Sequence, residues 1–237
     1  NWMASDPAKN LVPVDDIMSV ALKNNGNATS VVEYLGKVDD HWVAVPATTG
    51  SQLKGPCGRI DLLQKYAGLD VLKMYPGAGG KPDKALQDQW TWDAFLVAAE
   101  KCFKGGNPFG LGFGQTTDSV DWVGALFHAY GAQLVDAKGN ITVKSDAVKQ
   151  VLEYAQKLVR VVPPDVFAWD DASNNKYLIS GQGSLIMNPP SAWAVAKRDA
   201  PAIAADTWHF PTPRGKAGRL VPHRPYFWGI WQWSQNK

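Results

Sequence analysis

Amphipathic helical segments alternate along this sequence with short apolar runs of the kind that form buried strands. The clearest helical segment, SDAVKQVLEYAQKLVRVV, begins at the capping residue Ser145 and ends before Pro163-Pro164. Its apolar face is predicted to consist of Val148, Val151, Leu152, Ala155, Leu158 and Val159. A second helix is predicted from the cap Thr91 to the stop at Gly105-Gly106. Alternating helices and short strands predict the α/β class.

Shorter elements follow from turn and capping residues. The Asp15-Asp16 pair predicts a cap for a helix that runs to Lys23, and Gly68 is expected to end a helix over residues 59–67. Strands are predicted over residues 41–45, within SLIMN at residues 184–188, and as an isolated piece near TWHFPTP.

Charge and hydropathy exclude several classes of partner. The 237 residues carry 24 basic and 22 acidic side chains without a long run of one sign, so no nucleic acid or anionic membrane surface is expected as a partner. No apolar segment approaches the ~20 residues needed to span a bilayer. The start of the chain lacks the basic and apolar regions of a signal peptide, and any export signal is expected to have been removed.

The two cysteines, Cys57 and Cys102, lie too far apart for a zinc knuckle or a redox pair, and no metal or cofactor is expected. They form either one disulfide, in an oxidising compartment, or two buried thiols.

Tests for catalytic motifs are negative. GLGFG at residues 110–114 lacks the glycine spacing and the Lys-Ser/Thr of a phosphate-binding loop. There is no GxSxG elbow, and the four histidines lie in four different sequence contexts. No enzyme activity is expected.

Carboxylates beside aromatic residues leave two readings open. Asp170-Asp171 follow Trp169, and Asp118 and Asp121 precede Trp122. Such groups suit a glycoside hydrolase, but they equally suit a sugar-binding cleft, because carboxylates accept hydrogen bonds from hydroxyls and rings cover the apolar face of a pyranose. Alternatively, the aspartates only cap helices. Eleven tryptophans favour some rings facing a ligand, since core packing alone would rarely use all of them.

Eight segments, taken in order, resemble the bacterial extracellular solute-binding proteins of ABC transporters, in particular the sugar-type family 1. They are LVPVDD, HWVAVPATTGSQ, RIDLLQKYAGLD, WTWDAFLVAAEKC, WVGALFHAYGAQLVDAKGN, YLISGQGSLIMNPPSAW, HFPTPRGKAG and WGIWQWSQNK. One departure is Ala132, where the family usually has a second glycine. The resemblance covers essentially the whole chain.

The resemblance implies a periplasmic-binding-protein-like α/β fold of type II, with two lobes joined by a hinge. Residues 1–51 and 186–237 are expected in the first lobe and residues 52–185 in the second, with crossings near Thr48–Ser51 and Ile186–Asn188. Family members begin before and continue beyond the matching segments, so the first lobe is expected to be incomplete and the chain an internal piece.

The implied function is the substrate-binding component of an ABC importer, which captures a sugar or related polyhydroxy solute between two lobes and delivers it to the permease. The protein is expected to be a periplasmic monomer that meets the membrane only through the permease. The alternatives are a carbohydrate-active hydrolase and a carbohydrate-binding module without a hinge.

Ligand contacts are expected at the crossings and in loops that follow strands. The residues are Trp2, Thr48, Thr49, Ser51, Asp118, Trp122, Trp169, Asp170, Trp193, Arg224, Tyr226 and Trp228. The hydroxyl residues at 48–51 could equally form a plain polar linker. Arg224 could hold a carboxylate of an acidic sugar. Beyond this loop, Ile230 to Trp233 are expected to form a strand in which Trp231 and Trp233 share a face.

Overall fold

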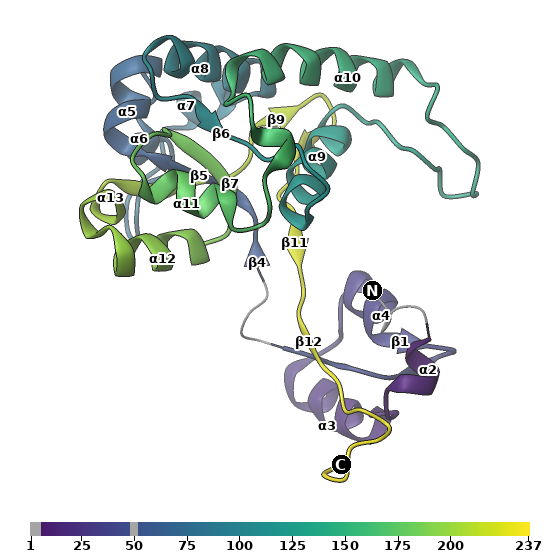
Figure 1. Ribbon diagram of the computed structural model, residues 1–237. Coiled ribbons are helices and arrows are strands. Elements are labelled where there is room, and N and C mark those ends of the chain that lie inside the picture. The colour runs from purple at the N-terminus through teal and green to yellow at the C-terminus, as the bar shows by residue number, and fades with distance from the viewer. Residues whose placement is uncertain (1–5, 48–51) are drawn as a thin grey trace. The chain divides into compact units, whose positions relative to one another are not determined.

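The computed structural model describes residues 6–47 and 52–237, and these divide into two compact units. Of these residues, unit 1 contains 6–47, 52 and 223–237, and unit 2 contains 53–222. Two chain crossings therefore connect the units, at residues 52/53 and 222/223 (Figure 1). The short strands β4 (Gln52–Leu53) and β11 (His223–Arg224) pair with each other at these crossings.

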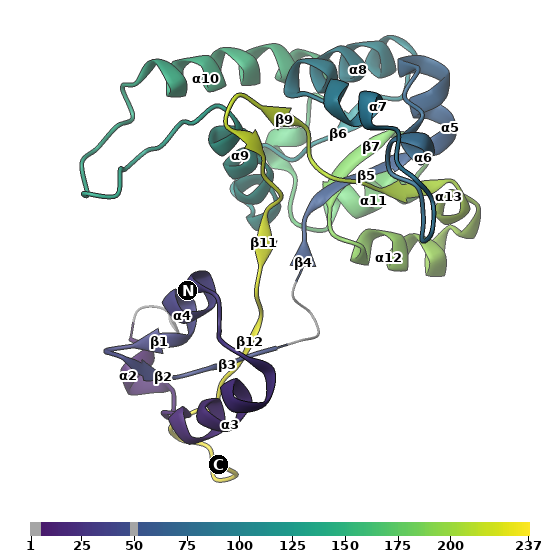
Figure 2. The same ribbon diagram turned by 180° about the vertical axis from the view of Figure 1, so that it is seen from behind.

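Unit 1 is built from short elements around a small core. Its helices are α2 (Pro7–Asn10), α3 (Asp15–Asn25) and α4 (Ser30–Gly36), and its strands are β1 (Lys37–Val38), β2 (His41–Trp42), β3 (Val45–Pro46) and β12 (Phe227–Trp228). Val14, Met18 and Trp42 form the buried centre. Strand β12 pairs antiparallel with β3, so the C-terminal segment runs beside the N-terminal part of the unit (Figure 2).

Two expectations for unit 1 are corrected. Helix α3 has no side-chain cap, and the carboxylate of Asp15 instead accepts a hydrogen bond from the backbone N–H of Trp42 at 2.9 Å. Residues 230–233 do not form a strand: Trp231 makes one isolated bridge with Leu11, and the chain then turns. The rings of Trp231 and Trp233 do lie together, stacked with centroids 4.8 Å apart.

Unit 2 is a four-stranded mixed sheet with helices on both faces. The strand order is β6 (Phe109–Gly110), β7 (Leu185–Asn188), β5 (Gly55–Arg59) and β8 (Thr207–His209). Strand β6 is parallel to β7, and β5 is antiparallel to both of its neighbours. The remaining elements are α5 (Ile60–Leu62), η1 (Leu63–Ala67), α6 (Val71–Met74), α7 (Lys84–Gln89), α8 (Trp92–Lys104), α9 (Thr117–Ala129), α10 (Asp146–Leu158), η2 (Val159–Val161), η3 (Val166–Ala168), α11 (Ser173–Ile179), α12 (Ser191–Asp199), α13 (Pro201–Ala205), β9 (Arg214–Gly215) and β10 (Gly218–Arg219).

Alternation along β7 creates two cores. Leu185 and Met187 join the large cluster with Phe95 and Phe109, on the side of α8 and α10. Ile186, on the opposite face, packs with Cys57, Leu178 and Ala192 in a smaller cluster beneath α11 and α12. Because both faces of the sheet are covered by helices, LIMN is apolar without polar alternation until Asn188.

The well-capped helices agree with their sequence patterns. The hydroxyl of Thr91 accepts from Ala94 N at 3.1 Å, and Ser145 caps α10 in the same way. The predicted apolar face of α10 is partly wrong, because Leu152 is exposed and Tyr154 is buried in its place. The Tyr154 hydroxyl donates to the carbonyl of Trp92 at 2.6 Å, which explains how a phenol is accommodated there.

The expected return crossing at Ile186–Asn188 is wrong, and with it the assignment of residues 186–222 to the first lobe. Strand β7 lies inside the sheet of unit 2, hydrogen-bonded to β6 and β5. The chain goes on through α12, α13, β8 and the β9–β10 hairpin before it leaves unit 2 at Pro222. The strand near Thr207 is also not isolated, since it pairs with β5.

We expect Gly55→Ala to lower the free energy of unfolding by about 1–3 kcal/mol, because an added Cβ would lie 2.6 Å from the backbone oxygen of Phe210. Gly124→Ala in α9 is the matched control: an added Cβ there meets nothing within 4 Å, and the helix should gain about 0.5–1 kcal/mol. Urea unfolding followed by circular dichroism measures both. Equal effects in the two variants would contradict the packing argument.

Candidate functional site

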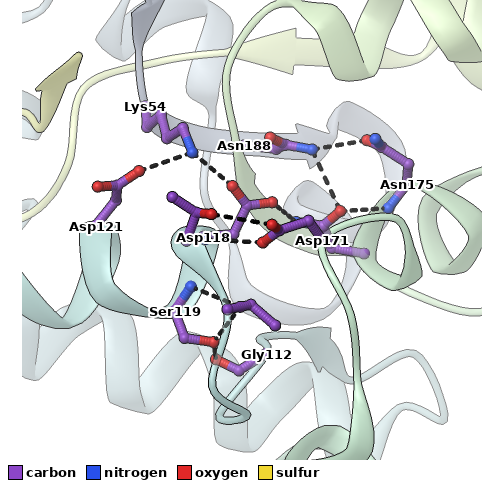
Figure 3. Close-up of polar contacts among 11 residues, drawn as sticks. Lys54, Gly112, Asp118, Ser119, Asp121, Asp171, Asn175 and Asn188 are labelled. Carbon is purple, nitrogen blue, oxygen red and sulfur yellow. Dashed lines mark hydrogen bonds and ion pairs between the residues drawn. The ribbon is translucent and has the colours of Figure 1, made fainter. Parts of the chain in front are cut away.

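Polar side chains gather at one edge of the unit 2 sheet. The parallel strands β6 and β7 end at this edge, and β5 begins there, since Gly55 pairs with Asn188. The residues that we call the polar edge are Lys54, Thr117, Asp118, Asp121, Asp171, Asn174, Asn175 and Asn188 (Figure 3). Ligands of open α/β sheets bind outside the carboxyl ends of the strands, which makes this edge the candidate site.

Lys54 lies between two carboxylates of α9. Its Nζ is 2.5 Å from Asp118 Oδ1 and 2.7 Å from Asp121 Oδ2, and its side chain is 7% exposed. Burial alone would lower the pKa of Lys54, but the hydrogen bonds to Asp118 and Asp121 outweigh it and raise the pKa above its ordinary value. The lysine is therefore a fixed cation at neutral pH.

An amide network continues from these carboxylates to the end of β7. Asn174 Nδ2 donates to Asp118 Oδ2 at 2.9 Å. Asn188 Nδ2 donates to Asn175 Oδ1 at 2.7 Å and to Asn174 Oδ1 at 3.3 Å. Asn174 and Asn188 are both buried, and their mutual hydrogen bonds offset the cost of that burial.

The first turn of α9 is held by Thr116 and Asp171. The Thr116 hydroxyl accepts from Ser119 N at 3.1 Å, and Asp171 accepts from Asp118 N at 3.1 Å and from the Thr117 hydroxyl at 3.0 Å. Burial raises the pKa of Asp171, but the hydrogen bonds from Asp118 N and Thr117 and the nearby charge of Lys54 together outweigh it, and the pKa lies below its ordinary value. Asp171 thus stays ionised and fixes the direction of α9.

A hollow of about 260 Å³ opens near the same edge. Its lining residues are Leu53, Gly55, Pro190, His209, Phe210, Pro211 and Val221. Burial lowers the pKa of His209 to about 4, and within the described part of the chain its buried Nε2 has no hydrogen-bond partner. The hollow is smaller than the ~300–1000 Å³ of a pocket that encloses a drug-sized ligand.

Of the predicted contacts in unit 2, Asp118 lies in the polar edge, whereas two tryptophans are core residues. Trp122 is 2% exposed, packs edge-on against Phe113 and donates from Nε1 to the carbonyl of Gly112 at 3.0 Å. Trp169 is also buried, with its ring against Tyr177. The prediction that Trp122 and Trp169 face a ligand is therefore corrected.

Asp170 and Trp193 have different surroundings. Asp170 is exposed, but its Oδ1 accepts from Ala172 N at 3.0 Å and from the Ser173 hydroxyl at 2.6 Å, so it holds the start of α11. The capping interpretation fits Asp170 at the start of α11 and Asp171 at the start of α9, whereas Asp118 and Asp121 pair with Lys54. Trp193 lies in the first turn of α12, shortly after β7; its ring is 40% exposed, and Lys197 Nζ lies 5.1 Å from its centroid.

The other predicted contacts lie in unit 1 or outside the described residues. Tyr226 and Trp228 are exposed, the latter on β12. Arg224 ends β11, and its side chain is not among those described. Trp2, Thr48, Thr49 and Ser51 lie outside the described residues. The role of all seven in binding stays a prediction.

Sequence reasoning missed Lys54 and the three asparagines. A usable signal existed for Asn188, since a polar residue at the carboxyl end of an otherwise apolar buried strand points to the ligand edge of a sheet. Lys54 gave no local signal, because the partners of its ammonium are more than sixty residues away in the sequence.

Three further observations bear on the expected chemistry. Of the two alternatives for the cysteines, the structure has the second: Cys57 and Cys102 are separate buried thiols with no disulfide between them. In residues 6–47 and 52–237, no group of three or more His, Cys, Asp or Glu side chains could hold a metal ion. Among the same residues, no helix is both long enough and apolar enough to cross a bilayer.

The sequence profile of one family, described as bacterial extracellular solute-binding protein, matches residues 1–234. The chain belongs to this family. Membership of this family explains why eight segments that resemble solute-binding proteins occur in order along the sequence.

Solved structures resemble this solute-binding protein across nearly all of its length. Maltose-bound MalE3 of T. maritima is 20% identical, with a TM-score of 0.71, covering 97% of this chain and 55% of that one. A solute-binding protein of Thermotoga lettingae TMO bound to α-D-tagatose is 18% identical, with a TM-score of 0.72 and coverages of 99% and 56%. The GacH receptor of Streptomyces glaucescens, solved unliganded and with acarbose, is 22% identical, with a TM-score of 0.67 and coverages of 99% and 54%.

These likenesses establish the α/β fold of type II periplasmic-binding proteins for this solute-binding protein. The chain spans about half the length of the solved structures that it matches. A comparison of this sequence with curated proteins found no match.

Proposed function

We propose that this protein is the substrate-binding component of an ABC importer and that it captures a sugar or related polyhydroxy solute. The observation that carries the proposal is the polar edge, where partly buried carboxylates and buried amides meet at the carboxyl ends of β6 and β7 in a member of a solute-binding family. The solved relatives with maltose, tagatose and acarbose support a hydroxyl-rich ligand.

The chemistry of the polar edge suits hydroxyl groups. Asp118 and Asp121 offer oxygens that accept hydrogen bonds, and Asn188 combines a donor with an acceptor. The half-exposed ring of Trp193 offers an apolar plane of the kind that covers a pyranose face. We propose that binding occurs between the two lobes and that hinge closure over the ligand produces the form that the permease recognises.

The setting of this function is also a proposal. Members of the family act outside the cytoplasm, and we infer a periplasmic monomer that contacts membrane-embedded permease subunits only when it delivers its solute. The family and its solved relatives are binding proteins, and we propose that this chain, like them, performs no covalent step.

A thermal-shift screen over sugars, polyols, sugar acids and oligopeptides tests the proposal. A ligand that binds only the native state raises the melting temperature by mass action, so at least one sugar or polyol should do so at millimolar concentration. A shift with oligopeptides alone would contradict the proposed ligand class. Release of phenol from aryl glycosides would favour the hydrolase alternative, and an unchanged scattering radius on sugar binding would favour a module without a hinge.

Trp193→Ala should weaken binding of the sugar found in that screen at least tenfold, or about 1.4 kcal/mol, because the change removes the exposed ring near the end of β7. Phe103→Ala, which truncates a similarly exposed ring on α8, is the matched control and should keep the wild-type dissociation constant. Titration calorimetry measures both. Equal affinities in the two variants would remove Trp193 from the site.

A further inference from the structure

Lys54 holds together the two chain segments that leave unit 2. It is the second residue of the unit, and its backbone N–H donates to the carbonyl of Pro222, the last residue of the unit, at 2.9 Å. Both crossings therefore begin at this one hydrogen bond. This hydrogen bond links the Lys54 backbone to both crossings.

The side chain of the same residue enters the polar edge. Its buried ammonium bonds Asp118 and Asp121, one turn apart on α9, while Asp118 also accepts from Asn174 (Figure 3). Breaking one partner of a buried ion pair is costly, so the lysine and α9 should move as one body. The crossings and the polar edge are thus connected through a single residue.

We propose that Lys54 is a positioning residue that couples occupancy of the polar edge to the crossings. The inference rests on the proposed function. A ligand hydroxyl that donates to Asp118 or Asp121 displaces these carboxylates while they stay paired with the Lys54 ammonium. The ammonium then shifts, and because the Lys54 backbone is bonded to Pro222, the shift reaches both crossings. Coupling of this kind is reciprocal, so the state of the crossings also changes the affinity for the ligand.

The test compares three single variants with the wild type. Lys54→Met removes the ammonium, Lys54→Arg keeps a cation, and Lys149→Met makes the same truncation at an exposed lysine that pairs only with Glu153 on α10 among its described ion pairs. Distances between the units are followed by fluorescence transfer between labels at Tyr34→Cys and Leu152→Cys. Both positions are exposed, one in each unit, and the native cysteines are buried.

With the sugar found in the screen, we expect the wild type and Lys149→Met to show the same dissociation constant and the same change in transfer. Lys54→Met should bind at least tenfold more weakly and show a smaller change in transfer at saturation, and Lys54→Arg should recover most of both. A purely structural lysine would lower the urea midpoint of Lys54→Met but leave the saturated change in transfer intact, and that result would overturn the inference.

Two further measurements keep the outcomes separate. If Lys54→Met does not fold, Asp121→Asn removes one partner of the ammonium and should reduce the saturated change in the same direction. If the wild type binds no sugar, the proposed function fails, and the ligand-free distribution of transfer then tests the coupling. Lys54→Met should broaden that distribution relative to Lys149→Met, and equal widths would overturn the inference.

Discussion

Trp90→Ala should lower the free energy of unfolding of this protein by about 3–5 kcal/mol, the largest effect that we expect from a single truncation. Trp90 is 1% exposed, and its ring packs against Phe95 and Phe210 with centroids 5.8 and 5.6 Å away. Its Nε1 also donates to the carbonyl of Pro211 at 2.9 Å. The alanine variant would leave a cavity between α8 and β8 and an unpaired buried carbonyl.

Urea unfolding followed by far-ultraviolet circular dichroism measures the loss. Trp90→Phe keeps most of the packing and removes the hydrogen bond, so it should cost much less, about 1–2 kcal/mol. Trp228→Ala is the control for loss of a tryptophan, because its side chain is 69% exposed and its removal should change stability by only about 0.5 kcal/mol. A Trp90→Ala variant as stable as Trp228→Ala would refute the assignment of Trp90 to the core.

Acidification should destabilise the protein through His209. Burial lowers the pKa of His209 to about 4 from its ordinary value of 6.5. The unfolded chain therefore binds a proton between these values that the folded chain does not, and stability falls as the pH drops through this window. From about pH 7.5 to about pH 4.5 the expected loss from this one group is roughly 2–3 kcal/mol.

His209→Phe should remove this part of the pH dependence while keeping a ring in the hollow. The measurement is the urea midpoint of the wild type and the variant at both pH values. Carboxylates such as Asp171, whose pKa is lowered, release their stabilisation only as the pH falls below about 3.8, so they contribute little in this window. An identical pH dependence in the two proteins would show that His209 is not buried in its neutral form.

Helices whose ends and buried faces are set by neighbouring residues could be predicted from the sequence. Helix α8 is fixed by its cap Thr91 and by its own apolar face, and helix α10 by Ser145, so both were predictable from neighbouring residues. Strand β5 was missed because GPCGR has none of the β-branched or aromatic residues that are enriched in strands. Its glycines are needed because Phe210 and Leu63 approach its backbone, which only the folded structure reveals.

The errors at the candidate site have a similar origin. The family resemblance implied a crossing at residues 186–188, and only the pairing of β7 with β5 places these residues inside the sheet. The sequence located Asp118 near the site but could not orient Trp122 or Trp169, since a ring beside a carboxylate can point into the core or away from it. The order of the motifs predicted the family correctly, because membership of a sequence family depends on the sequence alone.

The hydrogen bond between Lys54 N and Pro222 O also bears on the order of folding. Unit 2 is one uninterrupted stretch, whereas unit 1 must join β3 to β12 across all of residues 53–222. Closing a disordered loop of that length costs about 4–5 kcal/mol in chain entropy. Once unit 2 has folded, its first and last residues are already adjacent, and that cost no longer opposes unit 1. The nested arrangement thus favours a sequence of events in which unit 2 folds first and serves as the template on which the two separate parts of unit 1 meet.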